Sequence, residues 1–228
     1  MTDQVDIPEG ILDTLDRGAT LTDRVYERLR RGLMVGAWAP GDRLSARAIA
    51  RELAVSLTPV REAMLRLANE GALDLSETRS FRAPLLSRTE YHEVLRIRLA
   101  LEPMAAAIAA ERIAPDRVDA IEAVNERLAE LLRGDNYAEA LQADSEFHLS
   151  IYDAAAQPLL RSMIQSLLLR VGPTRTRLPR EYRKSLAGYS HHRRIIAALK
   201  AGDAEAAREA QATDLTEGAA KVLETLSD

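Results

Sequence analysis

Four side chains in the C-terminal half of the sequence have residue types and a spacing that suit metal ligation. Asp144 and His148 are four residues apart, so on a helix they share one face. His192 and Asp214 are 22 residues apart, on what the apolar pattern predicts to be the last two helices. In an antiparallel bundle all four could converge, and two imidazoles with two carboxylates would leave open positions on a divalent ion. From residue types alone, the commoner alternative is a hydrogen-bonded Asp–His pair at the surface or in the core.

Helices are needed to hold these side chains, and residues 87–228 show helical periodicity throughout. Ser87 or Thr89 is expected to cap a helix that runs to about Ile113. Further helices are expected at 115–133, 137–156, 158–172, 182–201 and 203–226. Six helices in roughly 140 residues predict an all-α antiparallel bundle of six or seven helices.

Residues 21–86 predict a second unit, in which three short helices are followed by a hairpin with strands at 72–75 and 80–83. This order is typical of a winged helix-turn-helix. Its last helix would enter the major groove, and its hairpin would lie beside phosphates or the minor groove. From the pattern alone, a small three-helix domain with solvated arginines is equally compatible. The expected helix caps are Thr22, Ser45 and Ser56.

Charge is unevenly placed along a chain whose formal net charge is -4. Residues 1–20 carry five acidic groups and one arginine, and we expect an acidic flexible tail there. Residues 21–90 carry 12 arginines against 9 acidic groups and are therefore basic, whereas the remainder is acidic. Such asymmetry is a modest indication of a nucleic-acid-binding domain joined to a domain of another kind.

Several classes of protein are excluded by composition. The chain has no cysteine, which excludes disulfides, thiolate zinc fingers, iron–sulfur clusters and cysteine nucleophiles. No run of 18 apolar residues occurs, so no membrane helix is expected. The acidic start of the chain is not a signal peptide, and we expect a cytoplasmic protein.

Several stretches resemble a known family. The N-terminal unit resembles the GntR family of bacterial transcription regulators in residues 21–30, 40–45 and 55–63. The helical unit resembles the FCD ligand-binding domain of the FadR subfamily in residues 98–102, 144–148 and 192–196, and its helix count is similar to the VanR branch. The resemblance implies a homodimer held by the helical domains, with two winged domains that read a short pseudo-palindromic operator.

The resemblance implies DNA contacts by Arg47, Thr58 and Arg61. Arg61 is the candidate for a guanine edge, because a guanidinium pairs with O6 and N7 in one plane, and Arg47 is expected at a phosphate. The family usually has arginine at Leu57 and glycine at Ser80, so recognition and the path of the wing are expected to differ here. The other DNA-binding candidates are Ser45, Ser56, Arg79 and Arg82.

The resemblance also strengthens the metal hypothesis. Many FCD domains bind a divalent ion through one aspartate and three histidines. Asp144, His148 and His192 match three of these positions, but Asp214 stands where the third histidine is usual. A second carboxylate favours harder ions, so zinc, nickel or manganese is expected with a shift toward manganese. His191 should point elsewhere on its helix.

Three further residues are candidates for effector binding. The resemblance implies that Arg98 can bind an effector carboxylate with both guanidinium nitrogens. An ion pair with Glu102, four residues on, is about as plausible. Tyr152, one turn beyond His148, and Arg175 are the other candidates for the pocket wall.

The leading hypothesis is a DNA-binding transcription regulator, expected to be a repressor, whose operator affinity responds to a small organic acid. One alternative is a metal sensor without an organic effector. Another is a small metalloenzyme, but a basic winged domain has no role in it. The sequence also offers no convincing nucleophile–base pair, phosphate-binding loop or oxyanion loop.

Overall fold

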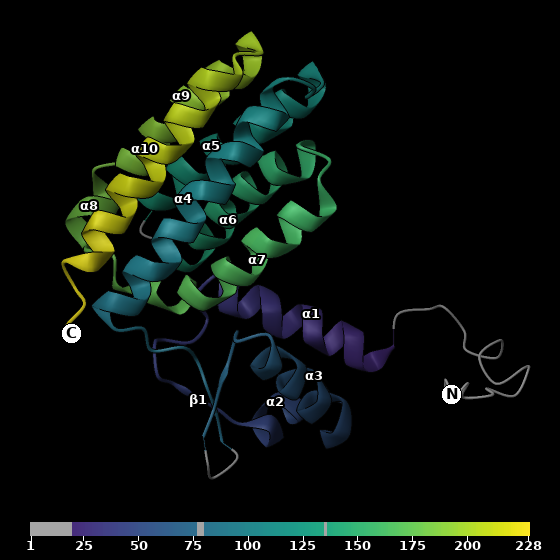
Figure 1. Ribbon diagram of the computed structural model, residues 1–228. Helices are drawn as coiled ribbons and strands as arrows, with labels where there is room; N and C mark the ends of the chain where they lie inside the picture. The colour runs from purple at the N-terminus through teal and green to yellow at the C-terminus, as the bar shows by residue number, and fades with distance from the viewer. Residues whose placement is uncertain (1–19, 77–79, 135) are drawn as a thin grey trace, which may run out of the picture.

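The computed structural model describes residues 20–76, 80–134 and 136–228 (Figure 1). The predicted acidic tail, except Thr20, and Arg79 of the wing lie outside the described residues. The N-terminal elements are α1 (Leu21–Met34), β1 (Arg43–Leu44), α2 (Ala46–Glu52), α3 (Leu57–Asn69), β2 (Asp74–Leu75) and β3 (Phe81–Arg82). The C-terminal elements are α4 (Arg88–Ala110), α5 (Pro115–Arg133), α6 (Tyr137–Ala154), α7 (Pro158–Val171), the 3-10 helix η1 (Pro173–Arg177), α8 (Arg180–Lys184), α9 (Ala187–Ala201) and α10 (Ala204–Leu223).

The first helix begins two residues earlier than its expected cap. Thr20 is the N-cap of α1, and its hydroxyl and the Asp23 carboxylate form a reciprocal capping box. Thr22 lies within the helix, where its hydroxyl donates a hydrogen bond to Glu62 of α3 at 2.9 Å. The prediction of Thr22 as cap was wrong because Thr20 offers the same hydroxyl and is the residue that has a carboxylate three positions on.

The wing contains a third strand that the sequence did not indicate. The sheet order is β1-β3-β2 with both pairs antiparallel, and Arg43 and Leu44 of β1 face Arg82 and Phe81 of β3. Leu44 and Phe81 are buried in the core of the unit. A strand of two residues directly after a Pro-Gly turn shows no alternation, so only its pairing partner defines it.

The C-terminal unit is the predicted helical bundle, in which α4 packs on α10, α5 packs on α6 and α9, and α9 packs on α10 (Figure 1). Six long helices are present in the described part of the chain, together with the short α8. Residues 182–201 were expected to form one helix, which was wrong: α8 ends at Lys184, and α9 starts at Ala187. The break lies at Leu186, whose φ of 56° is left-handed and cannot continue a right-handed helix.

The two units share one apolar core, which runs from the winged unit through α1 into the bundle. At their junction the last turn of α1 packs against the end of α7 (Figure 1). A Cβ at Gly172 would lie 2.2 Å from the carbonyl oxygen of Leu33, so only glycine permits this approach. In the described residues, no helix is long and apolar enough to cross a membrane.

Candidate DNA interface and ligand site

A basic groove lies between the wing and the start of α3. It has a volume of about 500 Å³, and among the described residues none of its lining side chains is acidic. The groove brings together three sequence-predicted DNA contacts, Ser45, Arg47 and Arg61, with the two positions at which the family resemblance is imperfect, Leu57 and Ser80. The other lining residues are Arg43, Leu44, Ala46 and Phe81.

Three guanidinium groups in this groove are available to nucleic acid. Arg43, Arg47 and Arg61 are exposed, and within the described ranges none of them has a hydrogen bond or ion pair. The guanidinium of Arg66, by contrast, already has partners within the protein. It lies 3.9 Å from the centroid of the Tyr26 ring, and its Nε is 3.2 Å from Glu70 Oε1. Unpaired guanidinium groups on one face suit phosphates and guanine edges.

Arg43 is a candidate contact that the sequence analysis missed. It lies on β1, and the pairing of β1 with β3 places it beside Arg47 and Arg61 in the groove. The signal in the sequence was its position two residues before the helix cap Ser45. That position places Arg43 in the groove only when β1 is known to pair with β3.

The remaining DNA-binding candidates differ in how far their side chains are already used in hydrogen bonds within the protein. Ser56 and Thr58 are exposed at the start of α3, and Ser56 occupies the N-cap position without a side-chain cap bond. The Ser45 hydroxyl accepts a hydrogen bond from the Ala48 N–H at 3.3 Å, yet its own proton stays available. Arg82 donates to the carbonyl oxygen of Gly41 at 3.0 Å, so part of its guanidinium is used within the wing.

The two departures from the family pattern have local explanations. The Ser80 hydroxyl lies 2.7 Å from the Ser76 hydroxyl, and the Ser76 N–H donates to the Ser80 carbonyl at 3.0 Å. A serine pair therefore closes the base of the wing turn where glycine was expected. Leu57 is half-buried and packs against the core, so it can offer DNA only an apolar edge.

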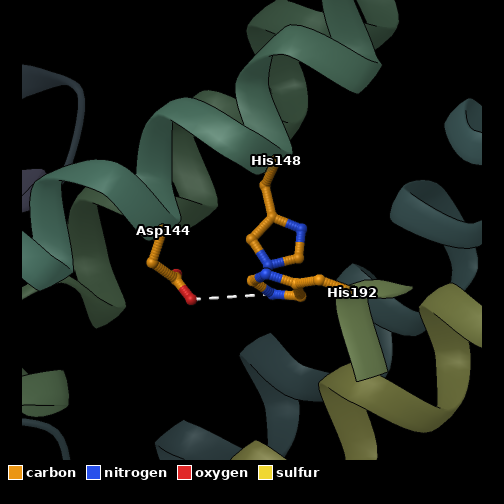
Figure 2. Close-up of side chains that lie close together, drawn as sticks. All are labelled: Asp144, His148 and His192. Carbon is orange, nitrogen blue, oxygen red and sulfur yellow. Dashed lines mark ion pairs between the residues drawn. The ribbon is translucent and has the colours of Figure 1, made fainter. Parts of the chain in front are cut away.

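The bundle brings three of the predicted metal ligands together (Figure 2). Asp144 and His148 project from α6, and His192 projects toward them from α9. One ligand atom from each lies within 4.8 Å of the others. The four-residue spacing on α6 and the placement of His192 on α9 thus bring these three side chains close together.

Asp214 on α10 borders this cluster through both of its oxygens. Its Oδ2 lies 3.4 Å from His148 Nε2, and its Oδ1 lies 3.7 Å from His192 Nε2. His192 Nε2 is also 3.7 Å from Asp144 Oδ1. Asp144, His148 and His192 are the three residues whose ligand atoms are mutually close enough for one divalent ion, and Asp214 lies at the edge of that group.

The orientation of His192 is set by its neighbours. It is fully buried, stacks on Phe147 at 3.9 Å between ring centroids, and its Nδ1 lies 2.9 Å from Asn125 Oδ1. The Asn125 amide nitrogen donates to the Tyr189 carbonyl, which leaves Oδ1 to accept the His192 Nδ1 proton. His192 Nε2 therefore carries no proton and has no hydrogen-bond partner, so its lone pair is available to a metal ion. Burial lowers the pKa of His192 to about 4, which keeps the ring neutral.

Gln211 has the corresponding position beside His148. It is fully buried, its amide nitrogen lies 3.4 Å from His148 Nδ1, and its Oε1 has no partner. A half-turn of the amide lets Oε1 accept the His148 Nδ1 proton. With its proton on Nδ1, His148 directs the lone pair of its Nε2 into the cluster.

Arg175 on η1 is the cation that now faces Asp144. Its guanidinium pairs with the Asp144 carboxylate and donates to the Ser145 hydroxyl at 2.9 Å. Burial alone would raise the pKa of Asp144, but the positive charge of Arg175 and the two histidines outweigh it and lower that pKa to about 2. A metal ion at this carboxylate would therefore compete with Arg175.

His191 does not point away from the site, contrary to our prediction. It is buried, its Nδ1 lies 3.7 Å from Asp214 Oδ1, and its Nε2 lies 3.2 Å from Glu217. The prediction was wrong because α10 packs along α9 closely enough for two adjacent α9 positions to face it. The nearby Asp214 carboxylate raises the pKa of His191.

Arg98 forms the ion pair that was the alternative to effector binding. Its Nε lies 2.6 Å from Glu102 Oε1, and both side chains are buried. Tyr152 donates its hydroxyl proton to Glu102 Oε2 at 2.7 Å. Arg98 also lines a cavity beside the cluster, whereas the Tyr152 hydroxyl is used by Glu102.

A cavity of about 110 Å³ adjoins the cluster, between α4, α6 and α10. Asp144, His148 and Asp214 line it together with Arg98 and Arg175. Charged groups of both signs around a small cavity are suited to a small polar ligand.

Comparisons with known proteins agree with both halves of this architecture. Residues 21–82 match the family described as bacterial regulatory proteins, gntR family, and residues 93–216 match the FCD domain. The chain belongs to the gntR family of bacterial regulators and carries an FCD domain. It is a DNA-binding transcription regulator, and the metalloenzyme alternative is set aside because the relatives are regulators.

Particular relatives cover most of the chain. It is 34% identical to the HTH-type transcriptional regulator McbR of Escherichia coli strain K12, over 83% of this chain and 86% of that protein. The solved structure of E. coli McbR/YncC superposes with a TM-score of 0.83 at 30% identity, covering 91% of this chain and 99% of that one. A probable D-xylose utilization operon transcriptional repressor from Paenarthrobacter nicotinovorans is 31% identical over 71% of each chain.

Proposed function

We propose that this regulator is a homodimeric repressor that senses a small carboxylate, bound together with a divalent metal ion in the bundle. Asp144, His148, His192 and Asp214 would hold the ion. The ion would supply a positive anchor for the effector carboxylate. The similarity to a named repressor supports the sign of the regulation.

The single observation that carries the sensing proposal is the position of Met34. This residue ends α1 of the DNA-binding unit, is buried, and lines the same cavity as the predicted metal ligands. The Gln165 amide of α7 also lies 4.0 Å from its sulfur. A ligand in the cavity would therefore contact the DNA-binding unit directly.

A second connection passes through Arg175. It follows Gly172, whose Cα abuts the backbone of Leu33 in α1, and Thr176 approaches Gly36 just after α1. Release of Arg175 from Asp144 would move η1 and, through these contacts, the end of α1. Ligand binding would thus change the placement of the winged unit, which is the differential contact that allosteric control requires.

The proposal is tested by metal analysis combined with operator binding. Protein purified without chelator or histidine tag should contain about one equivalent of metal per protomer, and His148→Ala and Asp214→Ala should each reduce it. An operator selected from random duplexes should bind tightly, and Arg61→Ala should weaken it by about 1–3 kcal/mol. Arg117→Ala, an exposed arginine on α5, is the matched control.

The outcomes separate the parts of the proposal. A change in operator affinity with metal alone, unaltered by any carboxylate, would identify a metal sensor instead. No bound metal after addition of manganese or zinc would remove the ion from the proposal and leave DNA binding intact. Equal loss of DNA affinity in the Arg61 and Arg117 variants would contradict the assignment of the groove.

A further inference from the structure

A second cavity adjoins the first on the far side of the Asp144–Arg175 pair. It has a volume of about 60 Å³ and lies between α5, α6, α8 and α9. The two cavities share part of their walls, so the Asp144–Arg175 ion pair borders both. The shared residues are Asp144, Arg175, Leu178, Tyr182 and Gly188.

The second cavity is mainly apolar. Its walls include the side chains of Leu128, Leu132 and Leu141 and the ring of Tyr137. The Tyr137 hydroxyl is used elsewhere, because it donates to the Arg175 carbonyl at 2.8 Å. The Tyr189 hydroxyl likewise donates to Glu126 at 2.9 Å, and walls that are mainly apolar favour hydrocarbon over a hydrated group.

Two helical glycines provide room in these walls. Gly188 of α9 borders both cavities, and Gly218 of α10 borders the first. A Cβ at either position would meet no other atom within 4 Å. Glycine lowers the stability of a helix relative to alanine, so two helical glycines beside open space suit a site that must leave room for a ligand.

We infer that the effector is a monocarboxylate with a short apolar tail. Its carboxylate lies in the first cavity between the metal site and Arg175, and its tail occupies the second cavity. This inference rests on the proposed function and names the chemical class of its ligand. Both cavities are smaller than the roughly 300–1,000 Å³ of sites for larger ligands, which limits the effector to a small acid.

Arg175 joins the two parts of the ligand. In the structure its guanidinium is held by Asp144 and Ser145. A divalent ion at Asp144 neutralises that carboxylate and releases one edge of Arg175. The freed guanidinium borders both cavities and is suited to bind a carboxylate placed between them.

A dicarboxylate is the competing ligand, and the second cavity disfavours it. A second carboxylate would lie among Leu128, Leu132 and Leu141, where an unpaired charge is costly. Arg183 is the one other cation in this wall, and its guanidinium is stacked over the Tyr137 ring at 3.9 Å. Its Nε has no partner, so the test must include a dicarboxylate.

The test is calorimetric titration of full-length, manganese-loaded protein with acetate, butyrate, hexanoate and adipate. Affinity should rise about fourfold for each methylene that enters the second cavity. Hexanoate should bind more tightly than adipate, which has the same number of carbons. The titrations are repeated after chelation, where the affinity for every acid should fall because Asp144 again holds Arg175.

Two variants locate the tail. Ala140→Leu fills the second cavity and should leave acetate binding intact while removing the gain with chain length. Ala138→Leu, exposed on the same helix, is the matched control and should retain the gain. If Ala140→Leu does not fold, Leu132→Ala, which enlarges the cavity, should shift the preference toward octanoate.

Each contrary result has a distinct meaning. Binding of acetate with no gain for hexanoate, or a gain that persists in the folded Ala140 variant, would overturn the inference alone. Tighter binding of adipate than hexanoate would also overturn it and assign Arg183 to a second carboxylate. Failure of every acid to bind would overturn the effector part of the proposed function together with the inference.

Discussion

Asp214 supplies a carboxylate where the FCD resemblance leads us to expect a third histidine. It lies near both histidines of the cluster through different oxygens, and its Oδ1 is also 3.7 Å from His191 Nδ1. Burial raises its pKa, but His192 and His191 outweigh this effect and lower it. An ionised second carboxylate makes the donor set harder and more anionic, so metal preference depends on this one residue.

Asp214→His should therefore change which ion binds. The ratio of zinc affinity to manganese affinity should rise by at least about tenfold, because imidazole replaces a hard carboxylate. Competitive metal titration against a chromophoric chelator measures that ratio. Glu217→His on the same helix is the control, since Glu217 contacts His191 rather than the cluster. An unchanged ratio in the Asp214 variant would mean that Asp214 is not a ligand.

The buried, neutral His192 predicts a pH dependence of stability in metal-free protein. Burial lowers its pKa from 6.5 to about 4, so between these values the unfolded chain binds a proton that the folded chain does not. The free energy of unfolding should fall as the pH drops from 6.5 to 4, by at most about 3 kcal/mol. Asp144, with its pKa lowered to about 2, loses its contribution only at lower pH.

Urea unfolding in the presence of a chelator, at several pH values, checks this dependence. His192→Gln cannot titrate and should flatten the curve between pH 4 and 6.5. His92→Gln, an exposed histidine on α4, should leave the curve as in the wild type. Identical slopes for the wild type and the His192 variant would show that another group is responsible.

At the scale of elements, the contact between α1 and the end of α7 joins the two units. Gly172 allows the backbones to meet, and η1, which carries Arg175, begins at the next residue. The winged unit is thus packed on the bundle rather than tethered by a free linker. Gly172, which contacts α1, and Arg175, which lines the proposed ligand site, therefore lie only three residues apart.

Gly172→Ala should disturb this contact. Its Cβ would lie 2.2 Å from the Leu33 carbonyl oxygen, and overpacking of this kind costs about 1–3 kcal/mol. Gly218→Ala is the matched control because its Cβ meets no atom within 4 Å, and it should be neutral or stabilise by up to about 1 kcal/mol. Urea unfolding measures both effects. Equal effects of the two variants would contradict the close approach.

At the scale of the whole molecule, the proposed dimer must cover an apolar surface. Helices α4 and α7 pack on each other and expose Ile97 at 44%, Leu159 at 73% and Met163 at 52%. Exposed large apolar side chains on two adjacent helices indicate an interface with another chain. Two winged units joined in this way would present two recognition helices to a pseudo-palindrome.

Leu159→Glu with Met163→Glu should therefore produce a monomer, because a charge in an apolar interface is not compensated. Sedimentation equilibrium measures the mass, and operator binding should weaken in parallel since one half-site contact is lost. Leu85→Glu is the control, a leucine that is 56% exposed and lies before α4. A dimer that persists in the double variant would place the interface elsewhere.

Much of the fold follows from local signals in the chain. Ser87, one of the two expected caps, caps α4, Asp203 caps α10 where the last helix was expected to begin, and Pro115 starts α5 as expected. These features are local because caps and proline act within one helical turn. The spacing of Asp144 and His148 is local for the same reason, so one helix alone aligns them.

The remaining features depend on contacts between segments that are distant in the sequence. β1 exists because β3 pairs with it, and His191 faces Asp214 because α10 packs along α9. Arg175 contacts Asp144 only because η1 folds back over α6, and Met34 joins the cavity only because α1 packs on α7. Short-range propensity carries no information about such contacts, since packing of apolar faces selects them. The sequence alone therefore indicates which residue types form the candidate ligand site. The contact between that site and the DNA-binding unit is decided by tertiary packing.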